Sequence, residues 1–333
     1  MNGLDRLNAW PRENLGFLPT PLRPAARLAQ AAGLPELWIK HDELIGFGFG
    51  GNKVRGLEVL LADALAKKAD VLVTGAGVQS NHVRATAAAA AHAGLAAVAV
   101  YWGSDPGPEH GNLRLTRMLG AQTRFTGNLD RAFVDVGIAL AVDELRAAGR
   151  RPYAIPRGGA CALGVLGHAL AALELHRQCV ATGLRPGVIL LAAGSGATLA
   201  GWLLATALLG QPWQVEAVTV SRPAAEVRAR AIALAAEAAH VLDAPASVGA
   251  SDAIVHDGFI GARYGAPTRA GDAAIVLAAR SQGVFFDRTY TGKAYAGLSA
   301  LAASGHFAGR GPVIFLHTGG EPALFADAPG SRT

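Results

Sequence analysis

The sequence predicts an α/β protein with mostly parallel sheets flanked by helices. Short apolar runs alternate with longer segments of helical periodicity, and parallel strands need helical crossovers of this kind. The chain has 333 residues, of which 51% are hydrophobic and 17% charged, so it can build a large core. Because single cores stop growing at about 250–300 residues, we expect two domains.

The expected strands are short and rich in valine, leucine and alanine. They occupy residues 37–40, 71–74, 96–101, 188–191, 215–220 and 313–316. The expected helices are longer and amphipathic or alanine-rich. They occupy residues 54–67, 82–92, 110–119, 131–148, 163–181, 198–208, 224–239, 270–281 and 293–303. Ligands of such folds bind beyond the carboxyl ends of strands, so the strand–helix junctions are the candidate sites.

Two glycine- and proline-rich segments are candidate domain crossings. Glycine is dense at 46–51, and proline and glycine cluster at 152–159. We therefore predict a small inserted α/β domain at 53–154. The large cofactor-binding domain would comprise 1–52 and 155–333, so both ends of the chain would build it.

Composition and charge exclude several classes of function. The net charge of +5 comes from scattered basic residues, which argues against nucleic-acid binding. Two cysteines give neither a disulfide framework nor a metal site, which favours a reducing cytoplasm and no metal. The uncharged stretches 85–102 and 186–215 are interrupted by glycines and lack flanking basic clusters, so we expect no membrane span.

Lys53 is the strongest single candidate for chemistry. It is one of only five lysines, and it follows Gly50, Gly51 and Asn52 at the start of an expected helix. A buried lysine amine can form a Schiff base with a carbonyl substrate or with pyridoxal phosphate. We interpret the other four lysines as structural or surface charges. Lys40, Lys67 and Lys68 would be strand-end and helix-end surface charges, and Lys293 would cap a helix or face solvent.

Two polar segments at strand–helix junctions suit anions. The run Gly194, Ser195, Gly196, Ala197 and Thr198 follows an expected strand, and its backbone N–H groups can converge on a phosphate. A tight turn that needs small residues is the alternative. The run Gln79, Ser80, Asn81 and His82 can bind a carboxylate in the same way. Its alternative is a helix N-cap at Ser80 or Asn81.

Three further side chains are weaker candidates when taken alone. Thr318 follows the last expected strand and can hydrogen-bond a heteroaromatic nitrogen, although a turn threonine is the simpler interpretation. Tyr264 and Tyr290 can act as acids, although a lone tyrosine is more often a half-buried packing residue.

Taken together, these segments resemble a family of pyridoxal-phosphate enzymes. The family contains D-cysteine desulfhydrase and 1-aminocyclopropane-1-carboxylate deaminase, and it has the two-domain, tryptophan-synthase-β-like fold of type II. The similarity runs from residue 19 to residue 325. Its most specific parts are Gly-Gly-Asn-Lys-Val-Arg at 50–55, Gln-Ser-Asn-His-Val-Arg at 79–84, Tyr-Thr-Gly-Lys-Ala at 290–294 and His-Thr-Gly-Gly at 317–320.

The resemblance implies a role for each candidate residue. Lys53 would carry the cofactor covalently and then move the α-proton, Asn81 would bind the ring hydroxyl, and Thr318 would meet the ring nitrogen. The cofactor residues would be Lys53, Asn81, Gly194, Ser195, Gly196, Ala197, Thr198 and Thr318. The substrate residues would be Gln79, Ser80, His82, Tyr264 and Tyr290. Catalysis would fall to Lys53, Ser80, Tyr264 and Tyr290.

One difference within the family favours β-elimination. The cyclopropane deaminases have a glutamate where this chain has Thr291, and threonine cannot supply the charge that strengthens the electron sink. The resemblance therefore implies conversion of D-cysteine to pyruvate, hydrogen sulfide and ammonia, with a small amino acid as substrate and a homodimer as assembly.

Three alternatives remain open at the level of sequence. One is cyclopropane-carboxylate deamination. Another is elimination of an anionic group, as in L-cysteate sulfo-lyase. Two observations suggest this anionic alternative. The chain departs from the desulfhydrase pattern at Gly56, Ala160, Leu199 and Arg288, and Arg157 and Arg288 add positive charge. The last is a catalytically silent homologue that binds amino acids.

Overall fold

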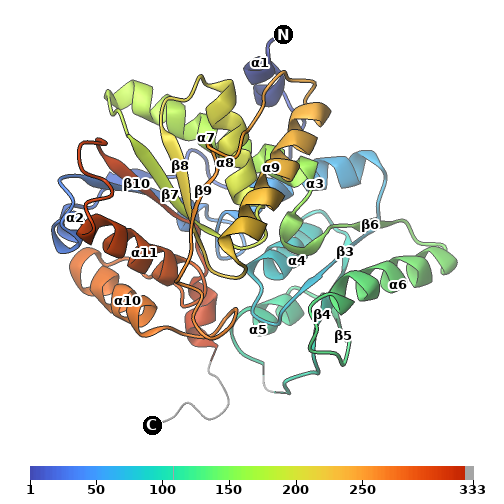
Figure 1. Cartoon of the computed structure of the whole chain (residues 1–333). Coiled ribbons are helices and arrows are strands. Elements are labelled where there is room, and N and C mark those ends of the chain that lie inside the picture. Colours follow the sequence, from blue (N-terminus) through green and yellow to red (C-terminus); the bar gives the residue numbers. More distant parts are fainter. Residues whose placement is uncertain (108, 327–333) are drawn as a thin grey trace.

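The computed structural model describes residues 1–107 and 109–326 and contains two sheets (Figure 1). The larger sheet has the order β1-β2-β10-β7-β8-β9. Its strands are β1 (Leu22–Pro24), β2 (Leu37–His41), β10 (Val313–His317), β7 (Val188–Ala193), β8 (Gln214–Thr219) and β9 (Ile254–His256). Every neighbouring pair is parallel except β1 and β2. The α/β fold with mostly parallel sheets is confirmed.

The smaller sheet is parallel throughout and has the order β5-β4-β3-β6. Its strands are β3 (Val71–Ala76), β4 (Ala96–Tyr101), β5 (Gln122–Phe125) and β6 (Pro152–Ala154). All four lie within the predicted insertion 53–154, whereas both ends of the chain contribute to the larger sheet. The exact domain boundaries stay a prediction.

Helices cover both faces of each sheet. They are α1 (Gly3–Asn8), α2 (Ala26–Ala32), α3 (Lys53–Ala66), α4 (Asn81–His92), α5 (Gly111–Met118), α6 (Phe133–Ala147), α7 (Ala162–Thr182), α8 (Ala197–Leu208), α9 (Ala224–Val241), α10 (Arg269–Gln282) and α11 (Thr291–Ala303). Among the described residues, no helix is both long and apolar enough to cross a bilayer.

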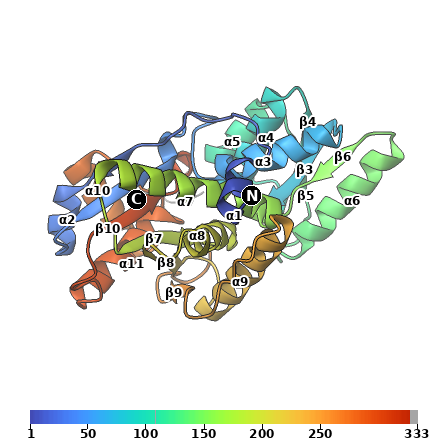
Figure 2. The ribbon, with the colours of Figure 1, turned by 90° about the horizontal axis from the view of Figure 1, so that it is seen from above.

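Strand alternation distributes the core over two faces of the larger sheet. All of β7 is buried, as expected for a central parallel strand. Ile189 and Leu191 pack into a core with α7, α8 and α9, whereas Val188 and Leu190 pack into a core with α2, α10 and α11. In the smaller sheet, α3 and α4 share one core, and α6 covers the opposite face, away from the larger sheet (Figure 2).

Every expected strand and helix is present, with ends shifted by a few residues. The sequence did not predict α1, α2, β1, β5, β6 and β9. Most of these are too short to show a period, and β5 has the sequence Gln-Thr-Arg-Phe, which contains no apolar run. Neighbouring strands in the sheet, rather than local preference, determine such segments.

The prediction that Lys40 is a surface charge was wrong. Its side chain is fully buried, and Nζ lies 2.7 Å from Thr20 O and 2.5 Å from Glu174 Oε1. Lys293 does not face solvent either, because its amine donates to Ile260 O at 2.6 Å from a buried position. Lys67 is exposed, as expected, and pairs with Asp63.

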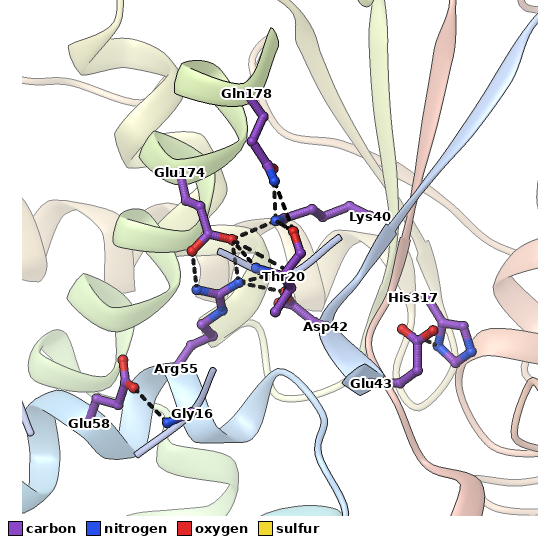
Figure 3. A network of polar contacts seen from close by, with 10 residues as sticks. All are labelled: Gly16, Thr20, Lys40, Asp42, Glu43, Arg55, Glu58, Glu174, Gln178 and His317. Carbon is purple, nitrogen blue, oxygen red and sulfur yellow. Dashed lines mark hydrogen bonds and ion pairs between the residues drawn. The ribbon is translucent and has the colours of Figure 1, made fainter. Parts of the chain in front are cut away.

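A buried ionic network joins α3 to the larger sheet and to α7 (Figure 3). Arg55 Nη2 lies 2.8 Å from Asp42 Oδ1, and Arg55 Nη1 lies 2.8 Å from Glu174 Oε2. Burial alone would raise the pKa of Asp42, but the Arg55 and Lys40 cations bring it below its ordinary value. Both carboxylates therefore stay charged and depend on their cations.

Replacing Arg55 with methionine should lower the free energy of unfolding by about 3–5 kcal/mol, because Asp42 and Glu174 would lose their partner inside the protein. Urea unfolding measures the change. Arg124→Met is the matched control, since its ion pair with Glu144 is largely exposed and should contribute at most about 1 kcal/mol. Equal losses in the two variants would contradict the role given to the network.

Candidate active site

Lys53 is the first residue of α3 and borders a cavity that is also lined by strand ends of both sheets, β3 and β7. The turn before it requires glycine: Gly50 has a φ of +66°, and a Cβ there would lie 1.9 Å from Glu43 O. The N–H of Asn52 donates to Thr318 O at 3.0 Å, which holds the turn against the end of β10. Lys53 Nζ donates to Gly158 O at 3.3 Å. Burial lowers the pKa of the Lys53 amine to about 8.

The predicted phosphate loop joins β7 to α8. Gly196 is the N-cap of α8 and has a φ of +92°, which glycine adopts without strain. The first N–H groups of an α-helix have no intrahelical acceptor, so those of α8 point toward this turn and can bind an anion. Arg230 Nε donates to Ser195 O at 2.8 Å and adds positive charge beside the turn.

Gly158 separates the lysine amine from the phosphate loop. A Cβ built on Gly158 would lie 2.8 Å from Ser195 Oγ and 4.0 Å from Lys53 Nζ. Gly194 borders the same cavity, since a Cβ there would lie 3.2 Å from the ring of Tyr290. Small residues thus leave room for a flat group that reaches from the amine to the loop, and pyridoxal phosphate fits this arrangement.

Hydrogen bonds fix the orientation of the Asn81 amide. Arg84 can only donate, and its Nε lies 3.0 Å from Asn112 Oδ1. Asn112 therefore presents Nδ2 to Asn81 Oδ1, at 2.8 Å. Because the oxygen of Asn81 is already an acceptor, the amide nitrogen is the atom that can donate to a ligand. Arg84 also donates to Gly48 O and Gly50 O, which ties this chain of bonds to the turn before Lys53.

Ser80 is the N-cap of α4 and accepts from the N–H of Val83 at 3.2 Å, which confirms the predicted cap. It also borders the cavity, so carboxylate binding by Ser80 stays a prediction beside the confirmed cap. The neighbouring residue Gln79 turns away. Its side chain donates to His110 O and accepts from the N–H of Asn112, and it does not border the cavity.

His82 is neutral and has a defined tautomer. Thr74 Oγ1 donates to Ile155 O at 2.8 Å, so it must accept from His82 Nε2, which lies 3.1 Å away. The other ring nitrogen, Nδ1, is therefore an acceptor, and it faces Gly159. Burial, together with the nearby Lys53 amine, lowers the pKa of His82 to about 3.

Tyr264 and Tyr290 form a pair of hydroxyls that share one hydrogen bond. Their oxygen atoms lie 2.5 Å apart, and the Arg131 guanidinium lies 5.3 Å from the centre of the Tyr264 ring. Burial raises the pKa of both phenols, so both keep their protons near neutral pH. One hydroxyl donates to the other, which leaves the second proton for a ligand.

Most of the predicted site residues border one cavity. They are Lys53, Ser80, Asn81, His82, Gly194, Ser195, Gly196, Thr198, Tyr264, Tyr290 and Thr318. Of the other two, Ala197 is the fully buried first residue of α8 and offers its backbone N–H, and Gln79 lies outside. Leu199 and Arg157 also border the cavity, whereas Ala160 and Arg288 do not.

Thr291 does not border the cavity either. Its hydroxyl accepts from the N–H of Asp287 at 2.7 Å and donates to Asp287 Oδ1 at 2.9 Å. It therefore closes the turn that begins α11. Thr318, which does border the cavity, is the threonine placed to meet a ring nitrogen.

Sequence reasoning missed several residues of the site. Asn52 supports the loop by donating from Nδ2 to Thr198 Oγ1 at 2.9 Å, and its position beside Lys53 was the available signal. Arg131 and Arg230 border the cavity but stand in ordinary helical sequence. Asn112 lies 31 positions from Asn81, and nothing local distinguishes it.

Comparison with known proteins decides the family. Residues 14–319 match the family model described as "Pyridoxal-phosphate dependent enzyme". The chain belongs to this family. Pyridoxal phosphate is therefore its cofactor, as predicted.

Curated relatives and solved structures narrow the position within this pyridoxal-phosphate family. The chain is 38% identical to D-cysteine desulfhydrase of Klebsiella pneumoniae (strain 342), over 98% of this chain and 99% of that one. It is 39% identical to the Salmonella choleraesuis protein of that name, with the same coverage. A crystal structure of an ACC deaminase homologue superposes with a TM-score of 0.90 at 34% identity, covering 98% and 96% of the two chains. The predicted type II fold and family are confirmed.

The lowered pKa of Lys53 should be visible in cofactor-free protein. Between pH 8 and pH 10 a lysine with a pKa of about 8 is mostly neutral, whereas one at the ordinary 10.5 is mostly charged. Since only the neutral amine attacks an aldehyde, the rate of covalent reaction with added pyridoxal phosphate should rise with a midpoint near pH 8. Stopped-flow absorbance follows it, and Lys53→Ala should lack the phase. A midpoint above pH 10 would contradict the prediction.

Proposed function

We propose that the protein catalyses α,β-elimination of a small β-substituted amino acid, with D-cysteine as substrate. Water is consumed, and pyruvate, hydrogen sulfide and ammonia are released. The position of Lys53 carries the proposal: a partly neutral amine lies across Gly158 from an anion-binding loop. The 38–39% identity to D-cysteine desulfhydrases over nearly the whole chain supports the substrate.

The residues around the cavity have the atoms that this cofactor needs. Lys53 would hold it covalently, the 194–198 loop would hold its phosphate, and the Asn81 amide nitrogen would donate to the ring oxygen. Thr318 would hydrogen-bond the ring nitrogen. When bound, pyridoxal phosphate withdraws electrons and stabilises negative charge on the α-carbon of the amino acid.

Three groups of the chain would handle the substrate. The hydroxyl of Ser80, at the N-terminus of α4, would bind the carboxylate, where the helix dipole also favours negative charge. The Lys53 amine, once released by the incoming substrate amine, would take the α-proton, for which its pKa of about 8 suits it. The hydroxyl proton that the Tyr264–Tyr290 hydrogen bond leaves free would go to the leaving sulfur.

Thr318 favours elimination over cyclopropane ring opening. A hydroxyl next to the ring nitrogen carries no charge, so it cannot hold the nitrogen protonated as a carboxylate does. The electron sink is then weaker, and loss of a thiolate from the β-carbon demands less of it than opening a ring. Thr291 does not border the cavity and its hydroxyl is bonded to Asp287, so Thr318 is the residue that carries this argument in the structure.

A second candidate substrate has an anionic leaving group, such as the sulfonate of cysteate. Four arginines border the cavity. Arg157 pairs with Asp135, and Arg222 pairs with Glu226. In the part of the chain that the structure describes, Arg131 and Arg230 have no carboxylate partner. Arg230 adjoins the phosphate loop, so Arg131, over the Tyr264 ring, is the cation placed to meet a charged β-substituent.

A homodimer and a cytoplasmic location complete the proposal. The cytoplasm agrees with two free cysteines, Cys161 and Cys179. The dimer rests on family resemblance, and sedimentation velocity of the purified chain tests it.

Lys53→Ala should lower turnover of D-cysteine by at least about 10³-fold, because both the covalent attachment and the proton transfer depend on this amine. Pyruvate release measures the rate. Lys67→Ala, on the exposed end of the same helix, is the control and should keep wild-type activity. Full elimination by Lys53→Ala protein would refute the mechanism, and wild-type protein that binds the cofactor without turnover would favour a silent homologue.

Arg131→Met should separate the two candidate substrates. If Arg131 meets an anionic β-substituent, the variant loses about tenfold or more in kcat/KM for cysteate and changes little for D-cysteine. Arg288→Met is the matched control, because Arg288 lies outside the cavity and pairs with Asp272. Equal losses for both substrates would show that Arg131 does not discriminate between them.

A further inference from the structure

A cluster of two histidines and a glutamate lies outside the active site. Glu216 is in the middle of β8, His256 ends the edge strand β9, and His306 lies in the turn after α11. None of the three borders the active-site cavity. Glu216 faces the side of the sheet that α11 covers, and the paired register of β8 and β9 places His256 on the same side.

The three potential ligand atoms converge on one point. His256 Nε2 lies 2.6 Å from Glu216 Oε2, and His306 Nε2 lies 2.9 Å from the same oxygen. All of them lie within 4.8 Å of one another. The Glu216 side chain is completely buried, whereas the His256 and His306 side chains are 17% and 29% exposed, so an ion can enter from solvent.

One close contact conflicts with the hydrogen bonds of this cluster. Arg310 Nη1 lies 2.8 Å from His306 Nε2, and a guanidinium can only donate. If His306 Nε2 carries a proton, this N–H group faces an N–H group of Arg310, and neither can accept. If it does not, its lone pair opposes the Glu216 carboxylate at 2.9 Å. In either tautomer one of these two close contacts is repulsive.

A cation at the point of convergence removes the conflict. The lone pairs of both histidine nitrogens and Glu216 Oε2 would then all face a positive charge. Arg310 would keep its ion pair with Glu216 Oε1, at 2.6 Å from Nη2, and its hydrogen bond from Nη2 to Gln214 Oε1, at 2.5 Å. The Arg310 guanidinium would thus hold the Glu216 carboxylate in place from the side away from the ion, as hydrogen-bond partners of metal ligands do.

We propose that Glu216, His256 and His306 form a structural site for a divalent transition-metal ion of the zinc class. Two imidazoles and one carboxylate suit Zn²⁺ with a water as fourth ligand, and they do not suit Mg²⁺ or Ca²⁺, which prefer oxygen. Bonds of about 2.0–2.2 Å require the ligand atoms to move apart by less than roughly 1 Å. Such an ion would fasten β9 and the turn after α11 to β8.

Zinc stoichiometry tests the proposal on protein loaded with pyridoxal phosphate. The protein is freed of metal with a chelator, incubated with Zn²⁺, desalted and analysed by mass spectrometry. Wild type should retain about one Zn²⁺ per chain, and Zn²⁺ should raise its Tm, because the ion binds the folded state only. Mg²⁺ should do neither. The double variant His256→Ala/His306→Ala should bind Zn²⁺ at least about tenfold more weakly.

His92→Ala/His240→Ala is the matched control, since both histidines are exposed, and it should bind zinc as wild type does. Glu216→Gln supplies a second test should the double variant fold poorly. An anomalous difference map of zinc-soaked wild-type crystals locates the ion without any substitution. Absence of retained zinc in wild type, equal retention by the double variant, or an anomalous peak elsewhere would each overturn the proposal.

Discussion

The buried Arg55 network is the constraint on which the rest of this molecule depends. Arg55 lies two residues after Lys53, and its guanidinium binds the carboxylates of Asp42, directly after β2, and of Glu174 in α7. One turn further along α3, Glu58 accepts from the N–H groups of Leu15 and Gly16. The start of α3 is therefore fixed to the larger sheet by charges that cannot relax into water, and so is the lysine that it carries.

Around that fixed point, the site is organised by atoms that can only donate or only accept. Arg84 forces the orientation of Asn112, which in turn forces that of Asn81. Thr74 forces the tautomer of His82 by donating to a backbone carbonyl. The donor and acceptor atoms of Asn81 and His82 are thus fixed before a ligand arrives, and preorganisation of this kind lowers the cost of binding and reaction.

Local sequence was sufficient to predict the long elements and the motifs, and insufficient to predict the short elements and the partners of each side chain. Lys53 could be singled out because a glycine-rich turn precedes it in the sequence, and the predicted phosphate loop because small residues follow a strand. The burial of Lys40 could not, because its partner Glu174 is 134 positions away. The hydrogen bonds of Thr291 could not be predicted either: its hydroxyl donates to Asp287, and no pattern of residue types shows where a side chain turns.

The anchoring of α3 has a consequence for motion. α3 is held at its start by the larger sheet, while its apolar side packs in one core with α4 and β3 of the smaller sheet. A rotation of the smaller sheet relative to the larger one would therefore move the start of α4, with Ser80 and Asn81, relative to the Lys53 amine. The fold thereby holds the Lys53 amine from the larger sheet and the start of α4 from the smaller one, so a change in the angle between the sheets would alter the width of the cavity while the amine keeps its place.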